Sequence, residues 1–536
     1  MKTKMASIGL RLGLVASLPA LIGATAPASA PQPIPAADAA NFCTALASRS
    51  FGRDVEITGT TYLPAAAPGS VPNGQGGFLK SGLPAYCKVE GMINRRAGAG
   101  GKEYGIGFAL ALPDAWNGRF LMQGGGGLNG VVRSPVGGDA AGDNPALARG
   151  FAVVSHDSGH KGMVFDSSFQ ADQRAALDFA ETAVLTVTLL GKEITTAHYG
   201  QPIAHSYMAG CSTGGRESML ASQRYPELFD GIVVGAPAMR TGFSNLGTAY
   251  AKVQFNQAAP RDAAGKALPE QAFSTADRKT ILTGMLAQCD ARDGLADGVI
   301  ADVAGCEFKP AKLQCTGAKQ DGCLSGAQVG ALERAFAGPK DASGHPLYVP
   351  VPFDTGVVDV SGPISGYIVS GKSDILGPAN ADVTMDVDAA AWAIRDDGMI
   401  RLTDTNVWTN LNTYLGRGGK ILFYHGVSDP WFSAYDTWDY WQRAREANGA
   451  EAWDNASRFY MVPGMAHCGG GNAFDNFDLL TEVVNWVEQG KAPVSPIARR
   501  STDLTQERPL CQHPNYPHYN GGDTKKASSY SCKLPS

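Results

Sequence analysis

A five-residue segment, 210–214 (GCSTG), holds the residue best suited to act as a nucleophile. It matches G-x-S-x-G, the sharp strand-to-helix turn that presents a reactive serine, here Ser212. The segment follows an apolar run and opens a helical pattern, as this turn requires. A serine hydroxyl is a weak nucleophile until a base removes its proton. A histidine and an acid are therefore expected near Ser212.

The base expected for Ser212 is His467, in the segment 464–468 (GMAHC). Each of the two residues has a cysteine neighbour, Cys211 before the serine and Cys468 after the histidine. If these cysteines are bonded to each other, covalent geometry brings the serine and the histidine together. A cysteine nucleophile at Cys211 is the alternative, but a residue before the apex of the turn points away from the substrate.

The acid that completes the set is predicted to be Asp429. In hydrolases with this turn the order along the chain is Ser, then Asp or Glu, then His. Asp429 and His467 follow two successive predicted strands, where parallel sheets place catalytic groups. Asp429 would hold the imidazole in the right tautomer. Asp436 and Asp439 rank lower because they fall on the next predicted helix, and His425 is equally well a pocket group or a packed loop residue.

The negative charge that develops during ester cleavage needs two backbone N–H donors. Thr213, the residue after the nucleophile, supplies the first donor. The glycine run 124–127 supplies the second, and Gly125 is the expected donor because glycines let the backbone approach the charge. The alternative interpretation of this run is a flexible turn without a catalytic role.

The elements that must position these groups alternate between strands and helices. The predicted strands are 105–112, 119–122, 151–155, 203–209, 229–236, 420–426 and 458–463, and the predicted helices are 172–190, 216–225 and 438–447. This alternation indicates a mostly parallel α/β sheet. It stops over residues 239–405, which are rich in Gly, Pro and Asp. The pattern therefore predicts one α/β domain with a large insertion after a central strand.

Length, composition and net charge restrict the kinds of fold and the partners that can be expected of this protein. A chain of 536 residues is too long for one ordinary core, and 44% of its residues are apolar, as in globular proteins. The net charge of −5 gives no reason to expect nucleic acid or an anionic membrane as a partner.

The N-terminus is typical of a secretory signal peptide, 1–30, with cleavage after Ala28 or Ala30. A transmembrane anchor is the alternative, but the apolar run is short and is interrupted by Arg11 and Pro19. Ten cysteines follow the signal, and an even number in an exported chain indicates disulfides. No C-x-x-C pair is present, which argues against a zinc ribbon or a thioredoxin-like site.

An acidic loop, 289–299 (CDARDGLADGV), is a candidate metal site. Asp290, Asp293 and Asp297 stand at the first, fourth and eighth places of the acidic stretch, with glycines between them. Calcium accepts such carboxylates together with backbone carbonyls and tolerates irregular geometry. The spacing is not that of an EF-hand, and a solvated acidic loop is the alternative.

Together these residues resemble the tannase/feruloyl esterase family of serine esterases, which includes mono(2-hydroxyethyl) terephthalate hydrolase. The mark of the family is a Cys-Ser…Asp…His-Cys arrangement with a disulfide beneath the triad. Here it is Cys211-Ser212, Asp429 and His467-Cys468. Further matching stretches are 116–120, 222–226, 229–232 and 462–465, so the resemblance covers nearly the whole mature chain.

The resemblance implies an α/β-hydrolase fold with a large inserted lid domain. The hydrolase domain would comprise residues 31–238 and 406–536, and the lid would be residues 239–405. Structural Ca²⁺ in the lid would be held by Asp290, Asp293 and Asp297 and by the carbonyls of Leu295 and Val299. The implied disulfides are Cys43–Cys87, Cys211–Cys468, Cys289–Cys306, Cys315–Cys323 and Cys511–Cys532.

We therefore expect a secreted or periplasmic serine carboxylic ester hydrolase that acts through an acyl-enzyme. The expected substrate is a small aromatic ester of the feruloyl or hydroxycinnamoyl type, free or attached to plant polysaccharide or polyphenol. Tannase activity on galloyl esters and hydrolysis of terephthalate monoesters are the alternatives, and a non-catalytic ligand-binding protein is a rival of another class. Arg395 and Arg401 lie near the position of the arginine that binds the terephthalate carboxylate, but in a different local sequence, which weakens the terephthalate alternative.

Overall fold

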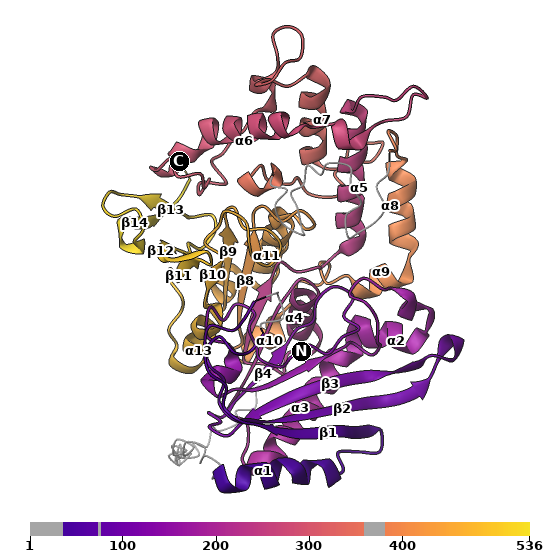
Figure 1. Ribbon diagram of the computed structural model, residues 1–536, viewed down its shortest axis with the longest axis vertical. Coiled ribbons are helices and arrows are strands. Elements are labelled where there is room, and N and C mark those ends of the chain that lie inside the picture. The colour runs from indigo at the N-terminus through magenta and orange to yellow at the C-terminus, as the bar shows by residue number, and fades with distance from the viewer. Residues whose placement is uncertain (1–35, 73–76, 359–380, 536) are drawn as a thin grey trace, which may run out of the picture.

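A nine-stranded sheet in the order β1-β2-β3-β5-β4-β6-β7-β8-β9 forms the body of the protein (Figure 1). A computed structural model describes residues 36–72, 77–358 and 381–535, so the predicted signal peptide, 1–30, lies outside the described residues. The strands are β1 (Val55–Leu63), β2 (Tyr86–Ala97), β3 (Glu103–Pro113), β4 (Arg119–Gln123), β5 (Ala152–His156), β6 (His205–Cys211), β7 (Gly231–Gly235), β8 (Lys420–Gly426) and β9 (Ser457–Val462). Strands β1, β2, β3 and β5 pair antiparallel, and every pair from β5 to β9 is parallel.

Helices cover both faces of the parallel part, which is why its strands are buried along nearly their whole length. On β5 and β7 every residue is buried, as expected of strands with an apolar layer on each side. Three helices, α3 (Ala183–Tyr199), α4 (Thr213–Arg224) and α11 (Ala434–Asn448), pack into the core on one face. Helix α13 (Leu479–Gln489) packs into the core on the other face. The predicted α/β class with a mostly parallel sheet is confirmed.

The helix predicted over 172–190 is interrupted. It consists of α2 (Gln173–Leu177), a π-helical turn (Asp178–Thr182) and then α3. A π turn releases backbone carbonyls from the usual ladder. The guanidinium of Arg216, on α4, donates to the carbonyls of Phe179 and Ala180 at 2.9 and 2.8 Å. A buried cation from another helix thus stabilises an irregularity that local periodicity does not reveal.

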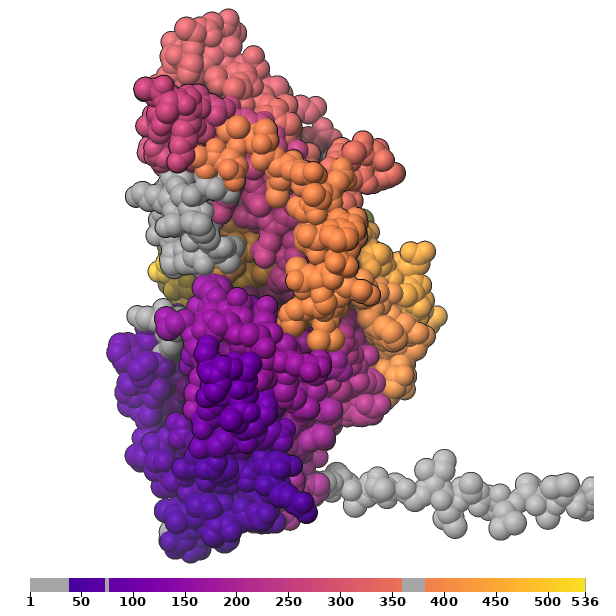
Figure 2. Space-filling view, turned by 90° about the vertical axis from the view of Figure 1, so that its right-hand side faces the viewer, coloured from indigo at the N-terminus to yellow at the C-terminus, as the bar shows by residue number. Residues whose placement is uncertain are grey.

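The described part of the inserted segment, 239–405 between β7 and β8, consists of helices joined by long loops and adds no strand to the large sheet. Its helices are α5 (Thr241–Ala258), α6 (Thr275–Cys289), α7 (Gly326–Ala337), α8 (Val387–Asp396) and α9 (Gly398–Thr403), and the short α10 (Asn412–Gly416) follows it. Capping boxes at Ser274 and Ser325 begin α6 and α7. Helices α5, α6 and α7 share their own hydrophobic core, and Ala391 of α8 packs with Leu246 of α5 in a smaller cluster. Figure 2 shows the segment, from magenta to orange, at the end of the molecule opposite the indigo N-terminal strands.

The C-terminal part forms two small sheets that the sequence patterns did not predict. They are β10 (Asn476–Phe477), β11 (Ile497–Arg500) and β12 (Asp503–Pro509), and β13 (Tyr516–Tyr519) with β14 (Tyr530–Lys533). The ten cysteines form five disulfides, Cys43–Cys87, Cys211–Cys468, Cys289–Cys306, Cys315–Cys323 and Cys511–Cys532. These are the pairs that the resemblance implies. Among the described helices, none combines the length and apolar character needed to cross a membrane.

Candidate active site

Ser212 stands at the apex of a strained turn between β6 and α4. Its backbone has φ 62° and ψ −122°, a conformation that costs a non-glycine residue about 1–3 kcal/mol. The turn is tight because the glycine loop after β4 lies against it. A Cβ at Gly214 would come within 2.8 Å of the Gly125 carbonyl oxygen, and one at Gly210 within 2.6 Å of Gly214. The small residues of the motif thus let backbone pack on backbone beside the serine.

His467 and Asp429 form a buried pair. The Nδ1 atom of His467 lies 2.6 Å from Oδ2 of Asp429. The other carboxylate oxygen, Oδ1, accepts the N–H groups of Trp431 and Phe432 at 2.9 and 3.1 Å. Burial alone would raise the pKa of Asp429, but the charge of His467 and hydrogen bonds from His425 and His467 hold this pKa well below its usual range. Asp429 is therefore a stable anion that fixes the imidazole.

A disulfide joins the turn of the serine to the loop of the histidine. Cys211 and Cys468 are bonded with a Cα–Cα distance of 5.9 Å, although 257 positions separate them. Ser212 and His467 are the chain neighbours of these two cysteines. The Nε2 atom of His467 is buried and has no hydrogen-bond partner within the described residues. The arrangement thus leaves an imidazole nitrogen available beside the serine's turn, and Cys211 is oxidised rather than a free thiol.

His425 is a packed residue that supports Asp429. Its Nε2 atom lies 3.2 Å from Asp429 Oδ2 and 3.0 Å from the Phe432 carbonyl, and its Nδ1 lies 2.9 Å from Thr437 Oγ1. The side chain is fully buried. Of the two interpretations left open for this histidine, the structure favours the packed residue.

The two alternative candidates for the catalytic acid form ion pairs with arginines. Asp436 accepts both arms of the Arg240 guanidinium, and Asp439 pairs with Arg443 at 2.8 Å. Neither carboxylate is near enough to His467 to form a hydrogen bond in the described part of the chain. Asp429 is therefore the acid that the fold brings to the histidine.

Of the two N–H groups predicted to bind the oxyanion, one has no acceptor among the described residues and the other is already hydrogen-bonded. The N–H of Thr213 meets no acceptor among the described residues. The N–H of Gly125, in contrast, donates to Oε2 of Glu217 at 2.8 Å. The carbonyls of Gly125 and Gly127 contact Gly214 N–H and the Thr213 hydroxyl, so Gly126 lies between two points of contact with the turn. Gly126 is half-buried, and its N–H has no acceptor in the described chain.

Glu217 is a functional candidate that the sequence reasoning missed. It is fully buried on α4. Besides the Gly125 N–H, it accepts Nδ2 of Asn129 at 3.0 Å, and Nε2 of His156 lies 3.7 Å away. Burial lowers the pKa of His156, although the charge of Glu217 opposes this effect. No sequence signal marks Glu217, because a glutamate five positions after the serine is indistinguishable from an ordinary helical residue.

Aromatic rings surround the histidine. The ring centroids of Trp431 and Phe432 lie 4.8 and 5.2 Å from that of His467. Phe165 makes an edge contact with Trp431 at 6.2 Å and is 39% exposed, and its neighbour Met163 is 79% exposed. An exposed aromatic and apolar rim therefore borders the site, which suits a flat aromatic ligand.

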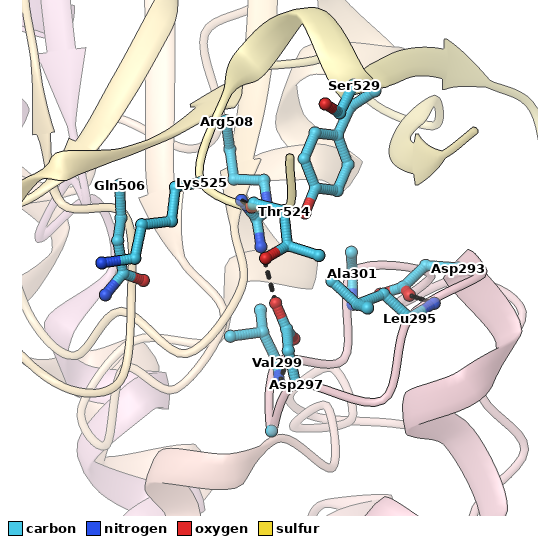
Figure 3. Close-up of polar contacts among 12 residues, drawn as sticks. Asp293, Leu295, Asp297, Val299, Ala301, Gln506, Arg508, Thr524, Lys525 and Ser529 are labelled. Carbon is cyan, nitrogen blue, oxygen red and sulfur yellow. Dashed lines mark hydrogen bonds and ion pairs between the residues drawn. The ribbon is translucent and has the colours of Figure 1, made fainter. Parts of the chain in front are cut away.

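The carboxylates of the acidic loop accept hydrogen bonds from the loop's own backbone and from Arg508. Asp293 accepts the N–H groups of Leu295 and Ala301 at 3.0 and 3.1 Å. Asp297 accepts the Val299 N–H at 3.1 Å and, from β12, the Arg508 guanidinium at 2.6 Å (Figure 3). Within the described residues, no three acidic, His or Cys side chains converge on one point.

The donor chemistry of this loop nevertheless fits Ca²⁺. Burial, with smaller contributions from the charges of Asp297 and Asp290, raises the pKa of Asp293 to about 7, against the effect of its backbone hydrogen bonds. Burial also raises the pKa of Asp290, whose carboxylate accepts the Gly298 N–H at 3.0 Å. Buried carboxylates that repel one another favour a hard cation with oxygen ligands.

The two arginines considered for a substrate carboxylate lie on the surface. Arg395 and Arg401 are both exposed, and the Arg395 guanidinium stacks over the Phe243 ring at 5.7 Å. Arg240 follows Ala238, whose N–H donates to the Ser212 carbonyl, by two positions, and it is neutralised by Asp436. No described contact places an unpaired cation beside His467.

The sequence matches one family model and several curated proteins. A family model described as tannase and feruloyl esterase matches residues 87–533. Mono(2-hydroxyethyl) terephthalate hydrolase of Piscinibacter sakaiensis is 36% identical over 519 residues, covering 84% of this chain and 85% of the relative. A probable feruloyl esterase of Arthroderma benhamiae is 30% identical over 460 residues, covering 79% and 81%.

Solved structures show the same fold. Feruloyl esterase B from Aspergillus oryzae superimposes with a TM-score of 0.71 at 25% identity, covering 92% of this chain and 100% of that one. For tannin acyl hydrolase from Aspergillus niger the TM-score is 0.69 at 21% identity, covering 92% and 94%. The expected resemblance is confirmed: the chain is a carboxylic ester hydrolase that belongs to the tannase and feruloyl esterase family.

Proposed function

We propose that the protein hydrolyses aromatic carboxylic esters with Ser212 as nucleophile, His467 as base and Asp429 as the acid that orients it. The observation that carries this proposal is the 2.6 Å contact of His467 Nδ1 with Asp429, which leaves the buried Nε2 atom without a partner. The Cys211–Cys468 disulfide supports it, because it ties the loop of the histidine to the turn of the serine.

The reaction follows from this arrangement in two halves. His467 Nε2 takes the proton of the Ser212 hydroxyl as Oγ attacks the ester carbonyl carbon. Asp429 stabilises the imidazolium that forms. The tetrahedral intermediate collapses, and the C–O bond to the alcohol breaks as His467 returns the proton to the leaving oxygen. Water, deprotonated by His467, then attacks the acyl-enzyme and releases the acid and the Ser212 hydroxyl.

The oxyanion is held in this proposal by the N–H groups of Thr213 and Gly126. Thr213 is unchanged from the sequence prediction. Gly126 replaces Gly125, because the Gly125 N–H already donates to Glu217 and one N–H cannot also point at the substrate. The N-terminal end of α4 adds its dipole to the same charge.

The aromatic rim favours an aromatic acyl group. Trp431, Phe432 and the exposed Phe165 offer ring faces and edges beside His467. Feruloyl-type esters are our first choice, because no unpaired cation that could hold a terephthalate carboxylate contacts the described site. Terephthalate monoesters are the second candidate, favoured by the 36% identity to mono(2-hydroxyethyl) terephthalate hydrolase. Galloyl esters remain a third substrate class, and the ester would be free or attached to plant polymer.

We further propose that the inserted segment acts as a lid and that the acidic loop binds structural Ca²⁺. The candidate ligands are the carboxylates of Asp290, Asp293 and Asp297 and the carbonyls of Leu295 and Val299. Bound calcium would stabilise the fold and take no part in the reaction. Five disulfides are typical of an oxidising compartment, which supports secretion or a periplasmic location.

The function is tested by labelling and by a substrate panel. A fluorophosphonate should modify Ser212, and the Ser212→Ala variant should fold normally, escape labelling and lose ester hydrolysis. Rates on methyl ferulate, methyl gallate and the terephthalate monoester separate the three substrate classes. Activity that survives in the Ser212→Ala variant would contradict the mechanism.

A further inference from the structure

We infer that Asp354, in the inserted segment, is a positioning residue that fixes the loops of Asp429 and His467 relative to each other. The inference rests on the proposed function of that pair. It assigns to the insertion a role in aligning the catalytic groups, separate from any contact with substrate.

One oxygen of Asp354 binds both loops. Its Oδ2 atom accepts the Ser428 hydroxyl at 2.7 Å and the backbone N–H of Gly464 at 2.7 Å. Ser428 directly precedes Asp429, after β8, and Gly464 opens the loop of His467, after β9. These partners are 74 and 110 positions away from Asp354 along the chain. A single carboxylate oxygen therefore joins the insertion to both loops that follow the neighbouring strands β8 and β9.

Further contacts hold Ser428 against the insertion and against the loop of His467. The Ser428 hydroxyl also accepts the Gly356 N–H at 2.9 Å, and the Ser428 N–H donates to the Met465 carbonyl at 3.0 Å. A Cβ at Gly356 would lie 2.6 Å from Ser428 Cβ, so the insertion reaches the loop through a glycine. The two catalytic loops thus contact each other and the same stretch of the insertion.

The Asp354 carboxylate is buried at this position between the loops. Asp354 is 1% exposed, and its Oδ1 atom is buried without a hydrogen-bond partner in the described part of the chain. Burial raises the pKa of Asp354, although the hydrogen bonds from Ser428 and Gly464 oppose this effect. A buried carboxyl group with half of its acceptor capacity unused is unfavourable for stability alone. Its position between the loops indicates a role in their alignment.

The test compares two substitutions of Asp354 with a matched control. Asp354→Ala removes both hydrogen bonds. Asp354→Asn keeps them, because its amide oxygen can occupy the place of Oδ2 and its NH₂ the place of the unpaired Oδ1. Asp277 is the control, since it is a buried carboxylate of the same insertion whose partners among the described residues, Ser274, Gln328 and Lys319, all belong to the insertion.

We expect Asp354→Ala to lower kcat about 10- to 100-fold with KM changed by less than about 3-fold, because small misplacements of catalytic groups cost this much. The acid limb of the kcat/KM profile should move to lower pH, since a looser Asp429 stabilises the imidazolium of His467 less. The titratable groups at this site are His467, Asp429 and His425, and Tyr435 faces Asp354. Asp354→Asn should restore most of kcat and the wild-type profile.

Asp277→Ala should lower stability while leaving kcat and the pH profile unchanged. If Asp354→Ala does not fold, Ser428→Ala removes one of the two bonds and should give a smaller loss of the same kind. The inference is overturned if the Asp354 and Asp277 variants lose the same activity, or if Asp354→Ala keeps the wild-type kcat and profile. Wild-type protein that fluorophosphonate does not label would instead refute the proposed function, and the inference with it.

Discussion

Replacing Glu217 tests whether this buried carboxylate holds the glycine loop beside the nucleophile. Leucine has nearly the same size as glutamate but accepts no hydrogen bond. Glu217→Leu therefore leaves the Gly125 N–H and one of the two Asn129 Nδ2 hydrogens without an acceptor, while the other still contacts the Ser158 hydroxyl. Each buried donor without a partner costs about 1–3 kcal/mol, so the free energy of unfolding should fall by about 2–6 kcal/mol. The loop can recover part of this cost by turning the Gly125 peptide toward another acceptor.

That movement would displace the neighbouring Gly126 N–H from the oxyanion. Loss of one oxyanion donor lowers kcat about 10²- to 10³-fold in serine hydrolases. We therefore expect Glu217→Leu to lower kcat about 100-fold, with KM within about 3-fold of wild type, because the displaced Gly126 N–H donates mainly to the transition state.

Glu217→Gln is the matched control. Its amide oxygen can accept the Gly125 N–H, and its NH₂ can donate to Asn129 Oδ1 after that side chain flips. Asn129 Oδ1 has no hydrogen-bond partner among the described residues, and after the flip it can also accept the Ser158 hydroxyl, which contacts Asn129 Nδ2 in the wild type. Steady-state hydrolysis of methyl ferulate measures kcat, and urea unfolding measures the free energy of unfolding. A Leu variant with wild-type kcat would refute the positioning argument, and an equal loss in the Gln variant would show that charge, not acceptance, matters.

Three further predictions concern pH, the central disulfide and calcium. Burial lowers the pKa of His160 to about 4, so between about pH 7.5 and pH 5 the unfolded chain binds a proton that the folded chain does not, and stability falls as pH falls. His160→Phe should reduce this loss by about 2 kcal/mol in urea unfolding at the two pH values, and an undiminished loss in the variant would refute the argument. Replacing Cys211 and Cys468 together by serine should lower the free energy of unfolding by up to about 5–6 kcal/mol, because the disulfide closes a loop with a separation of 257 residues. The same variant should have a lower kcat. An unchanged kcat would show that the disulfide does not align the catalytic groups. Chelation should lower the melting temperature of the wild type, Ca²⁺ should restore it, and Asp293→Asn should abolish the difference; equal melting curves with and without chelator would count against the calcium site.

The sequence predicted the elements of the α/β sheet and the identity of the triad candidates. The fold prediction is confirmed because apolar strand runs are a local signal, and the triad candidates were chosen from equally local signals, a glycine-flanked serine turn and a histidine beside a cysteine. The antiparallel strands β1 and β2, the small C-terminal sheets and the π turn before α3 were missed. Their stability comes from distant partners, as the Arg216 guanidinium on the Phe179 and Ala180 carbonyls illustrates.

Only the tertiary structure decided which of the predicted groups is available for chemistry. The glycine run was recognised from sequence, but the choice between Gly125 and Gly126 depends on Glu217, a residue 92 positions away in the chain. The role of His425 depends in the same way on where Asp429 and Thr437 lie. Sequence determines which donors and acceptors exist, whereas folding determines which are already paired, because hydrogen bonds between distant segments form only when their backbones meet.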